Sequence, residues 1–418
     1  IQTDEQRTDS LGCYGSAWAK TPNIDNLAER GVTFRNCYCE SPLCMPSRSS
    51  QLSCRYPQEC NAVTNGADDF PPGIVTFPEV FADAGYYTAT FGKWHTAAHP
   101  MWQEFEDCRH FRQYASIREL ADGYSHADYH VVRDPATKLI LGGTYPGNDD
   151  TPSKHITDRG IAFLRNREDD TPFLLRVSHL WPHTPVLPPP PFDNLYQPDE
   201  IPIRYFDKEA FHARSCRDQE WGNWFDIQNM DRESFARTWT NYMGLCAYVD
   251  HEVGRLLEAL HTLNLAENTI VIFSSDHGRA LGEYGAPEKH TFDDAVWRVP
   301  FIISWPGQLP QGEYRNDICS LIDTGRTLTG LTGLQQQCPH QWRGRDLFHD
   351  PVPPQAEQAA FGQIGFPDND VPAGRRHQKR KNHHIFGKSM RVGIRTSRYR
   401  MDVDWMRKGK RLSADDYD

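Results

Sequence analysis

Residues 269–275, with the sequence TIVIFSS, form an apolar run that leads directly into the polar triplet DHG at 276–278. An apolar run without polar alternation predicts a strand inside a sheet that is covered on both faces. Three more short runs, 87–91 (YTATF), 172–178 (PFLLRVS) and 299–305 (VPFIISW), predict further strands. The pattern favours a sheet of short, buried strands at the centre of the fold.

Helices are predicted between these strands. The strongest covers 234–263, where apolar residues recur at three- and four-residue steps. A shorter helix is predicted over 76–85 (TFPEVFADAG), which ends at a glycine, a common helix terminator. Strands that alternate with helices predict an α/β fold built on a large, mixed but mostly parallel sheet that is flanked by helices.

Polar clusters follow the predicted strands or lie on the loops after them. They cover 3–7 (TDEQR), 92–95 (GKWH), 179–183 (HLWPH) and 276–278 (DHG). The active sites of open α/β sheets lie beyond the carboxyl ends of the strands. We therefore expect these four clusters, which are far apart in the sequence, to meet in one functional site.

The overall composition excludes several classes of protein. The chain has 418 residues, more than the roughly 250–300 that a single hydrophobic core supports. Its net charge of −11 argues against nucleic acid as a partner. No apolar run approaches the roughly 20 residues that span a bilayer, so we expect no membrane span. The first residues, IQT, resemble the end of a strand, and we expect the natural N-terminus to lie further upstream.

The last part of the chain shows a different pattern. Apolar residues alternate over 390–394 and again over 399–405, which predicts an antiparallel hairpin. The segment 351–354 (PVPP) is the expected linker. We therefore predict a large domain over 1–350 and a small C-terminal α+β subdomain with an antiparallel sheet over 351–418.

The eleven cysteines show no CxxC spacing, and most are expected to be small buried residues. Cys44 differs, because it begins the segment CMPSR at 44–48. Pro46 suits the first turn of a helix, which would place Cys44 at a helix N-terminus, where an anion is favoured. Arg48 lies one turn later. The segment therefore has two interpretations, a nucleophile in an anion pocket or a structural cysteine beside a turn.

The segment 44–48 is similar to the C-x-P-S-R motif of type I sulfatases, which belong to the alkaline phosphatase superfamily. Other segments resemble motifs of this family in the same order. They are TDEQR at 3–7 with LGCYG at 11–15, GKWH at 92–95, PHTP at 182–185, SDHG at 275–278 and KHT at 289–291. Each motif is weak alone, but their common order is specific. The resemblance covers residue 3 to about 345 and implies an alkaline phosphatase-like fold.

The resemblance implies a modified nucleophile and a metal ion. In this family the cysteine that matches Cys44 is oxidised to formylglycine, so a formylglycine-generating or anaerobic sulfatase-maturing enzyme is the implied partner. The positions that match the metal ligands are Asp4, Glu5, Asp276 and His277. Calcium is the expected ion, with Mg²⁺ and Mn²⁺ as alternatives. Glu5 stands where Asp, Gln or Asn is expected.

The resemblance also implies roles for five basic side chains. Lys93 and Lys289 match the sulfate-binding lysines, and Arg48 matches the arginine that holds the formylglycine. His183 matches the group that contacts the sulfate and the leaving oxygen, and His95 matches the histidine that assists breakdown of the sulfated intermediate. Without the resemblance, the lysines would be interpreted as solvated charges and the histidines as packed loop residues.

The implied reaction is the hydrolysis of a sulfate ester. Hydrated formylglycine at position 44 attacks sulfur, and the alcohol leaves with a proton from His183 or Lys289. His95 then deprotonates the remaining hydroxyl, and sulfate is expelled as the aldehyde forms again. A divalent ion neutralises charge on the sulfate oxygens.

Two residues depart from the family pattern. Cys54 stands where the family usually has glycine, just inside the segment that the maturing enzyme reads. Glu288 precedes Lys289 where a small residue is usual. A carboxylate beside a sulfate site is unfavourable unless it points away or meets a cationic group.

The substrate implied by the resemblance is a sulfated carbohydrate or glycan. The first alternative is a phosphonate or phosphate ester hydrolase with the same nucleophile and metal, and the second is a catalytically silent glycan-binding relative. The basic run 375–384 (RRHQKRKNHH) is either an electrostatic contact to a sulfated glycan or a solvated loop. The expected location is periplasmic or extracellular, with the cytoplasm as the alternative.

Overall fold

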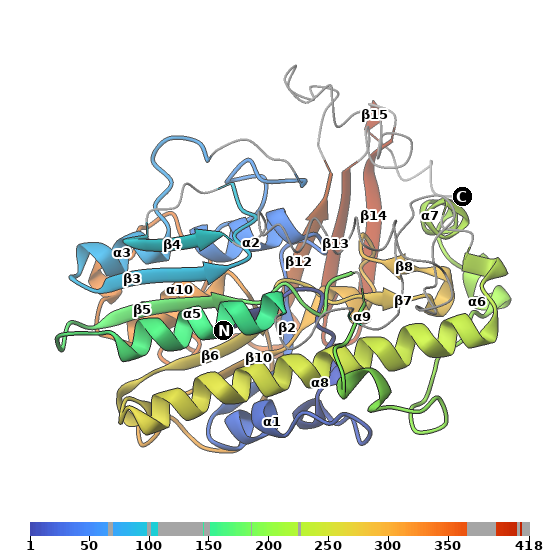
Figure 1. Cartoon of the computed structure of the whole chain (residues 1–418). Helices are drawn as coiled ribbons and strands as arrows, with labels where there is room; N and C mark the ends of the chain where they lie inside the picture. Colours follow the sequence, from blue (N-terminus) through green and yellow to red (C-terminus); the bar gives the residue numbers. More distant parts are fainter. Residues whose placement is uncertain are drawn as a thin grey trace.

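A mixed sheet of nine strands forms the centre of the described structure (Figure 1). The computed structural model describes residues 1–65, 70–97, 102–107, 145, 151–184, 186–224, 227–365, 390–407 and 410–411. The basic run 375–384 lies outside these residues. In spatial order the strands are β11 (Glu313–Ser320), β2 (Val32–Tyr38), β10 (Phe301–Ser304), β6 (Val271–Ser275), β1 (Gln2–Thr3), β5 (Phe173–Ser178), β3 (Tyr87–Gly92) and β4 (Glu104–Asp107), with β9 (Arg298–Val299) paired to β2.

The direction of the strands agrees with the predicted mixed, mostly parallel sheet. From β6 through β1, β5 and β3 to β4, all neighbouring strands are parallel. β10 is antiparallel to both β6 and β2. The predicted strand 299–305 is divided into β9 and β10 by Pro300, because proline has no N–H group to donate to a ladder. The prediction of a mixed α/β sheet is therefore confirmed.

Two predicted helices are confirmed, with shifted ends. The predicted helix 234–263 is α8 (Arg232–Thr262), and it begins after Asp231, whose carboxylate accepts a hydrogen bond from Ser234 N at 2.7 Å. The predicted helix 76–85 is α3 (Phe77–Asp83), which begins with a capping box. The other α-helices in the described part of the chain are α1 (Pro22–Glu29), α2 (Cys44–Ser53), α5 (Pro152–Arg165), α6 (Lys208–His212), α7 (Cys216–Trp224), α9 (Asp294–Trp297) and α10 (Asp323–Leu331).

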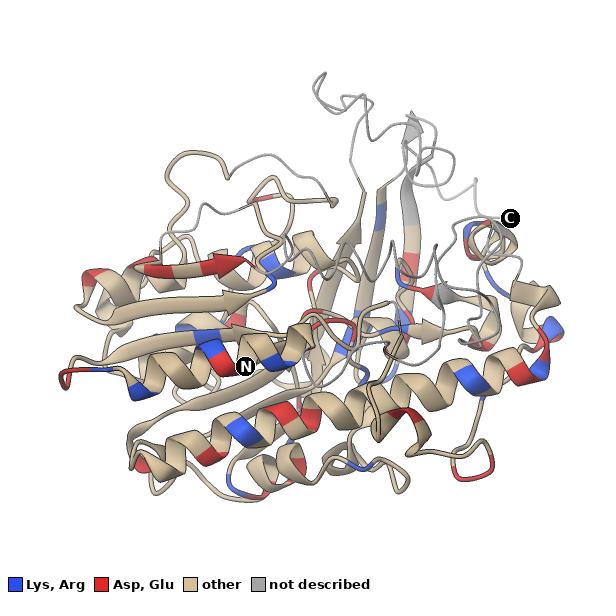
Figure 2. Ribbon diagram, in the orientation of Figure 1, with Lys and Arg blue, Asp and Glu red and all other residues tan. Residues whose placement is uncertain are grey.

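Both faces of the sheet are covered, as the apolar strands predicted. Val177 of β5 packs against a cluster that includes residues of α5 and α8, whereas Leu174 packs against a cluster that includes α3 and α10. This alternation follows the two-residue period of a strand. Charges of both signs lie along α5 and α8 (Figure 2), and Arg255 of α8 binds Asp158 of α5 at 2.5 Å. The helices thus fix the sheet from both sides and leave the strand ends for a site.

A separate antiparallel sheet follows the main one and contains the predicted hairpin. Its strands, in order, are β12 (Ala359–Ile364), β13 (Met390–Thr396), β14 (Arg400–Arg407) and β15 (Lys410–Arg411). It is joined to the main sheet region by hydrogen bonds such as Gln363 N to Glu40 O at 2.9 Å. The hairpin prediction is confirmed, and the division into 1–350 and 351–418 stays a prediction.

The cysteines in the described part of the chain are mostly buried, as expected. Eight of the ten described cysteines are buried, and Cys216 and Cys338 are the exceptions. Among the described helices, none combines the length and apolar character needed to cross a membrane.

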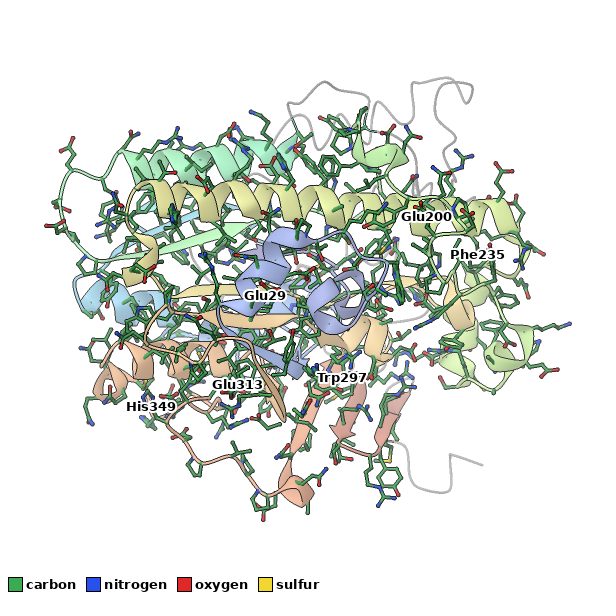
Figure 3. All side chains as sticks on the ribbon, turned by 90° about the horizontal axis from the view of Figure 1, so that it is seen from below. Glu29, Glu200, Phe235, Trp297, Glu313 and His349 are labelled. Carbon is green, nitrogen blue, oxygen red and sulfur yellow. The ribbon has the colours of Figure 1, made fainter. Side chains whose placement is uncertain are left out.

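A glycine pair allows the small sheet to pack closely against Trp297 of α9 and Phe292 of the loop before it. Gly362 and Gly393 lie opposite each other in β12 and β13. A Cβ at Gly393 would lie 2.8 Å from a ring carbon of Phe292, and a Cβ at Gly362 would lie 3.0 Å from the Trp297 ring. Figure 3 shows Trp297 beside the strands of the small sheet. The contact surface therefore requires residues without side chains at these positions.

We expect Gly393→Val to lower the free energy of unfolding by about 1–3 kcal/mol, because the added side chain would overpack the Phe292 ring. Met401→Ala is the control, since Met401 of β14 is 59% exposed and should change stability by less than about 0.5 kcal/mol. Urea denaturation followed by circular dichroism measures both. Equal stability of the Gly393 variant and the unsubstituted protein would contradict this packing.

Candidate active site

The four predicted polar clusters meet at the carboxyl ends of β1, β3, β5 and β6. Main-chain hydrogen bonds join them, from Asp276 N to Thr3 O at 3.3 Å, from His179 N to Gln2 O at 2.8 Å and from Lys93 N to Ser178 O at 2.8 Å. The expectation that these distant segments share one region is therefore confirmed. The strand register brings the residues after each strand side by side.

The buried guanidinium of Arg48 connects these segments. Nε donates to Asp276 Oδ2 at 2.7 Å and Nη2 donates to Asp4 Oδ2 at 2.8 Å. Nη1 donates to Ser178 Oγ at 2.8 Å and to Lys93 O at 3.1 Å. Asp4 and Asp276, which are 272 positions apart in the sequence, thus bind one side chain.

Cys44 is the first residue of α2, as its position before Pro46 predicted. Its Sγ lies 3.2 Å from His277 Nε2, 3.3 Å from Lys289 Nζ and 3.9 Å from Asp4 Oδ1. Burial would raise the pKa of the thiol, but Lys289, Lys93 and His277 hold that pKa well below its usual range. Position 44 therefore lies at a helix N-terminus among cations, which favours a nucleophilic anion there.

Three of the four predicted metal ligands form a cluster with Cys44. One potential ligand atom from each of Asp4, Glu5, Cys44 and His277 lies within 4.8 Å of the others, and all four residues are buried. Asp276 lies at the edge, since its Oδ1 is 3.9 Å from His277 Nε2 and accepts hydrogen bonds from the main-chain N–H groups of Glu5 and His277. Buried carboxylates beside an imidazole fit a hard divalent cation.

Two lysines form ion pairs with carboxylates of this cluster. Lys93 Nζ forms an ion pair with Asp4 Oδ2, and Lys289 Nζ donates to Glu5 Oε1 at 2.6 Å. Burial and the Cys44 thiolate would raise the pKa of Asp4, but Lys93, His183 and Arg48 lower it to about 2. Asp4 is therefore ionised in the neutral pH range, as a metal ligand must be.

His183 lies at the more open side of the cluster. Its Nε2 is 3.2 Å from Lys289 Nζ and 3.3 Å from Glu5 Oε1, and its side chain is 19% exposed. Its Nδ1 is 2.6 Å from the carbonyl oxygen of Thr184, which orients the ring if Nδ1 donates. The next residue, Pro185, is outside the described residues. Nε2 of His183 is thus directed toward the charged groups of the site.

His95 follows Lys93 by two residues, in the loop after β3. It is half-buried, and its φ of 39° lies in the left-handed region. The contacts given above join nine of the ten predicted residues, and the tenth, His95, is the second residue after Lys93.

Two residues that hold Glu5, Arg279 and Tyr242, were not predicted as site residues from the sequence. Arg279, which is 1% exposed, binds Glu5 Oε2 through Nη1. Tyr242 of α8 donates from its hydroxyl to Glu5 O at 2.7 Å and accepts from Arg7 N at 2.9 Å. The position of Arg279 directly after 276–278 does not by itself indicate its contact with Glu5.

The structure gives a physical reason for one departure from the expected pattern. Cys54 follows the last residue of α2 and has a φ of 53°, the left-handed conformation that glycine adopts most easily. The other unusual residue, Glu288, has Oε1 3.8 Å from Nη2 of Arg279. It therefore faces a cation of the protein.

The comparisons with known proteins agree with the geometry. Residues 1–334 match the family model described as Sulfatase. The chain is 27% identical to an N-acetylglucosamine-6-O-sulfatase of Bacteroides thetaiotaomicron, covering 80% of this chain and 67% of that protein. It is 30% identical to an ulvan-active sulfatase of Formosa agariphila, covering 83% of this chain and 63% of the other. The chain thus spans about two thirds of the length of these relatives.

A solved structure shares the fold. The phosphonate monoester hydrolase of Silicibacter pomeroyi superposes with a TM-score of 0.77 at 21% identity, covering 97% of this chain and 86% of that chain.

His179 is a buried histidine at the start of the cluster 179–183. It is 0% exposed, and among the described residues neither ring nitrogen has a hydrogen-bond partner. Burial lowers its pKa to about 3 from the ordinary 6.5. The unfolded chain therefore binds a proton near pH 6.5, whereas the folded chain does so only near pH 3, and stability is lost as the pH falls between these values.

We expect His179→Leu to gain stability relative to the unsubstituted protein as the pH falls from about 6.5 toward about 3. Urea unfolding of both proteins at a series of pH values measures the difference. Two stability curves that stay parallel over this range would show that His179 titrates alike in the folded and unfolded chains.

Proposed function

Because this chain belongs to the sulfatase family and has its alkaline phosphatase-like fold, we propose that it hydrolyses a sulfate ester of a sulfated carbohydrate. The observation that supports this most strongly is the position of Cys44. It lies at the N-terminus of α2, in contact with Lys289 and within the cluster of Asp4, Glu5 and His277. A nucleophile, an acidic metal-binding cluster and cations for an anionic substrate thus share one buried site.

The nucleophile we propose is formylglycine, made from Cys44 by a formylglycine-generating or anaerobic sulfatase-maturing enzyme. Once formed, this residue supplies the oxygen nucleophile as a hydrated aldehyde. Lys289 and His277 lie 3.3 Å and 3.2 Å from the Cys44 Sγ, so both are in reach of groups at position 44. They would stabilise negative charge that develops there.

The metal we propose is calcium, held by Asp4, Glu5, Asp276 and His277, with Mg²⁺ or Mn²⁺ as alternatives. Carboxylate oxygens are the preferred ligands of such hard cations. When bound, the ion would neutralise charge on a sulfate oxygen. Arg48 fixes two of the four ligands, since it donates to both Asp4 and Asp276.

The remaining predicted residues act on the substrate in this proposal. Lys93 and Lys289 would bind sulfate oxygens, because a divalent ion beside Asp4 and Glu5 would compete with them for those carboxylates. His183 would give a proton to the leaving sugar oxygen from Nε2, while Nδ1 is held by the Thr184 carbonyl. His95 would remove the proton that allows sulfate to depart.

The relatives support a carbohydrate substrate, since one is an N-acetylglucosamine-6-O-sulfatase and another is an ulvan-active sulfatase. We propose a sulfated glycan as the substrate and a periplasmic or extracellular location for the protein. The alternative is a phosphonate or phosphate monoester, since such an ester also presents a tetrahedral anion and the Silicibacter pomeroyi enzyme shares the fold.

We expect Cys44→Ala to reduce sulfate release to background while the folded structure persists, because the nucleophile is lost. Cys338→Ala is the matched control, since Cys338 is half-buried beside Thr329, outside the site, and its loss should leave turnover unchanged. Sulfate released from sulfated monosaccharides, measured by ion chromatography, gives the result. Turnover by the Cys44 variant would contradict the mechanism. Faster hydrolysis of an aryl phosphonate than of the matching aryl sulfate would favour the alternative.

We expect His183→Ala to lose roughly 100-fold or more activity on a sulfated sugar, the usual scale of general acid catalysis. The loss on nitrophenyl sulfate should be much smaller, because nitrophenolate leaves without a proton. Comparing kcat/KM of both proteins on both substrates measures this ratio. Equal losses on the two substrates would show that His183 binds sulfate without protonating the leaving group.

A further inference from the structure

Arg279 lies between the two acidic residues that depart from the expected pattern, Glu5 and Glu288. Its Nη1 binds Glu5 Oε2, and its Nη2 lies 3.8 Å from Glu288 Oε1. From this bridge we infer that Arg279 is a positioning residue, which fixes Glu5 so that a single oxygen, Oε1, faces the metal cluster. This inference rests on the metal site of the proposed function.

Arg279 is fixed firmly enough to act in this way. It is 1% exposed and follows His277 by two residues. Its main-chain N–H donates to Ala295 O at 2.9 Å, and its carbonyl accepts from Arg7 Nη1 at 3.0 Å. Both sides of its backbone are therefore held, and the side chain is confined between Glu5 and Glu288.

Glu5 needs such a partner because its side chain is longer than that of aspartate. The residue is 0% exposed, and Oε1 lies 2.6 Å from Lys289 Nζ and 3.3 Å from His183 Nε2. The extra methylene group gives the carboxylate an additional rotatable bond and more than one direction. Arg279 occupies Oε2 and leaves Oε1 on the side of Lys289, whose Nζ also lies 3.3 Å from Cys44 Sγ.

Glu288 completes the arrangement from the other side. Ala280 pairs with Glu288 in the short antiparallel sheet of β7 (Ala280–Leu281) and β8 (Pro287–Glu288), so Arg279 and Glu288 are held near each other. The single charge of Arg279 thus faces two carboxylates. A buried arginine with two acidic neighbours is retained in the folded state at less electrostatic cost than one with none.

The direction in which metal affinity changes when Arg279 is removed distinguishes a positioning role from a purely electrostatic one. A positive charge beside a cation site repels the ion, so removal of Arg279 would tighten metal binding if only its charge mattered. If Arg279 orients Glu5, its removal weakens binding, because the carboxylate is no longer directed at the ion. Loss of residues that orient metal ligands typically weakens metal affinity by roughly 10–100-fold.

The test measures calcium affinity in the full chain by titrating the calcium-loaded protein with EGTA. We expect Arg279→Gln to weaken calcium binding roughly 10–100-fold and Arg279→Lys to weaken it less. The double variant Glu5→Gln, Arg279→Gln should bind calcium no more weakly than Glu5→Gln alone, because Arg279 acts through Glu5. Additive losses in the double variant would overturn the proposal.

Arg391→Gln is the matched control for loss of a buried, ion-paired arginine. Arg391 is 4% exposed and binds Asp218 and Asp402. This variant should lower Tm and leave the calcium affinity unchanged. Unchanged or tighter calcium binding in Arg279→Gln would overturn the positioning role of Arg279 but not the metal site. Failure of the unsubstituted protein to bind calcium would overturn the metal site and, with it, this inference. If Arg279→Gln does not fold, calcium affinity of Arg279→Lys equal to that of the unsubstituted protein would overturn the inference.

Discussion

The ion pairs of Arg48 with Asp4 and Asp276 are the interaction on which the site depends. A guanidinium that is 0% exposed requires partners for its charge and for its N–H groups, because an unpaired buried charge is very unfavourable. Arg48 finds these partners at the ends of β1, β3, β5 and β6. One helical turn separates it from Cys44, so the same contacts that satisfy the arginine also fix the start of α2 against the acidic cluster.

The carboxylates of the site are equal in number to its lysines and arginines before any ion or substrate is added. Four carboxylates and four permanent cations form two groups of ion pairs, which the hydrogen bond from Glu5 N to Asp276 Oδ1 at 3.2 Å joins. The carboxylates are Asp4, Glu5, Asp276 and Glu288, and the cations are Arg48, Lys93, Arg279 and Lys289. Attraction for an anionic ester must therefore come from a redistribution of these charges. A divalent cation among the carboxylates would provide it, because it would release the two lysines from Asp4 and Glu5.

The sequence predicted the fold class and the meeting of the polar clusters because both depend on local patterns. The apolar run 269–275 and the periodic run in α8 each identify one element, and strand ends of a parallel sheet necessarily share an edge. Arg279 could not be found in this way, since its importance depends on Glu5, which lies 274 positions earlier. The division of one predicted strand at Pro300 was readable in principle from the missing N–H group of proline.

The backbone conformation of two residues near the site explains why local sequence patterns do not predict the position of their side chains. Glu5, with a φ of 64°, and Glu288, with a φ of 60°, adopt the left-handed region that non-glycine residues usually avoid. Such conformations persist only where the surrounding structure holds them. Glu5 is held on both sides, since its N–H donates to Asp276 and its carbonyl accepts from Tyr242. This conformation directs the Glu5 carboxylate toward Arg279 and Lys289. The position of the carboxylate is therefore determined by contacts with distant segments and cannot be predicted from the residues next to Glu5.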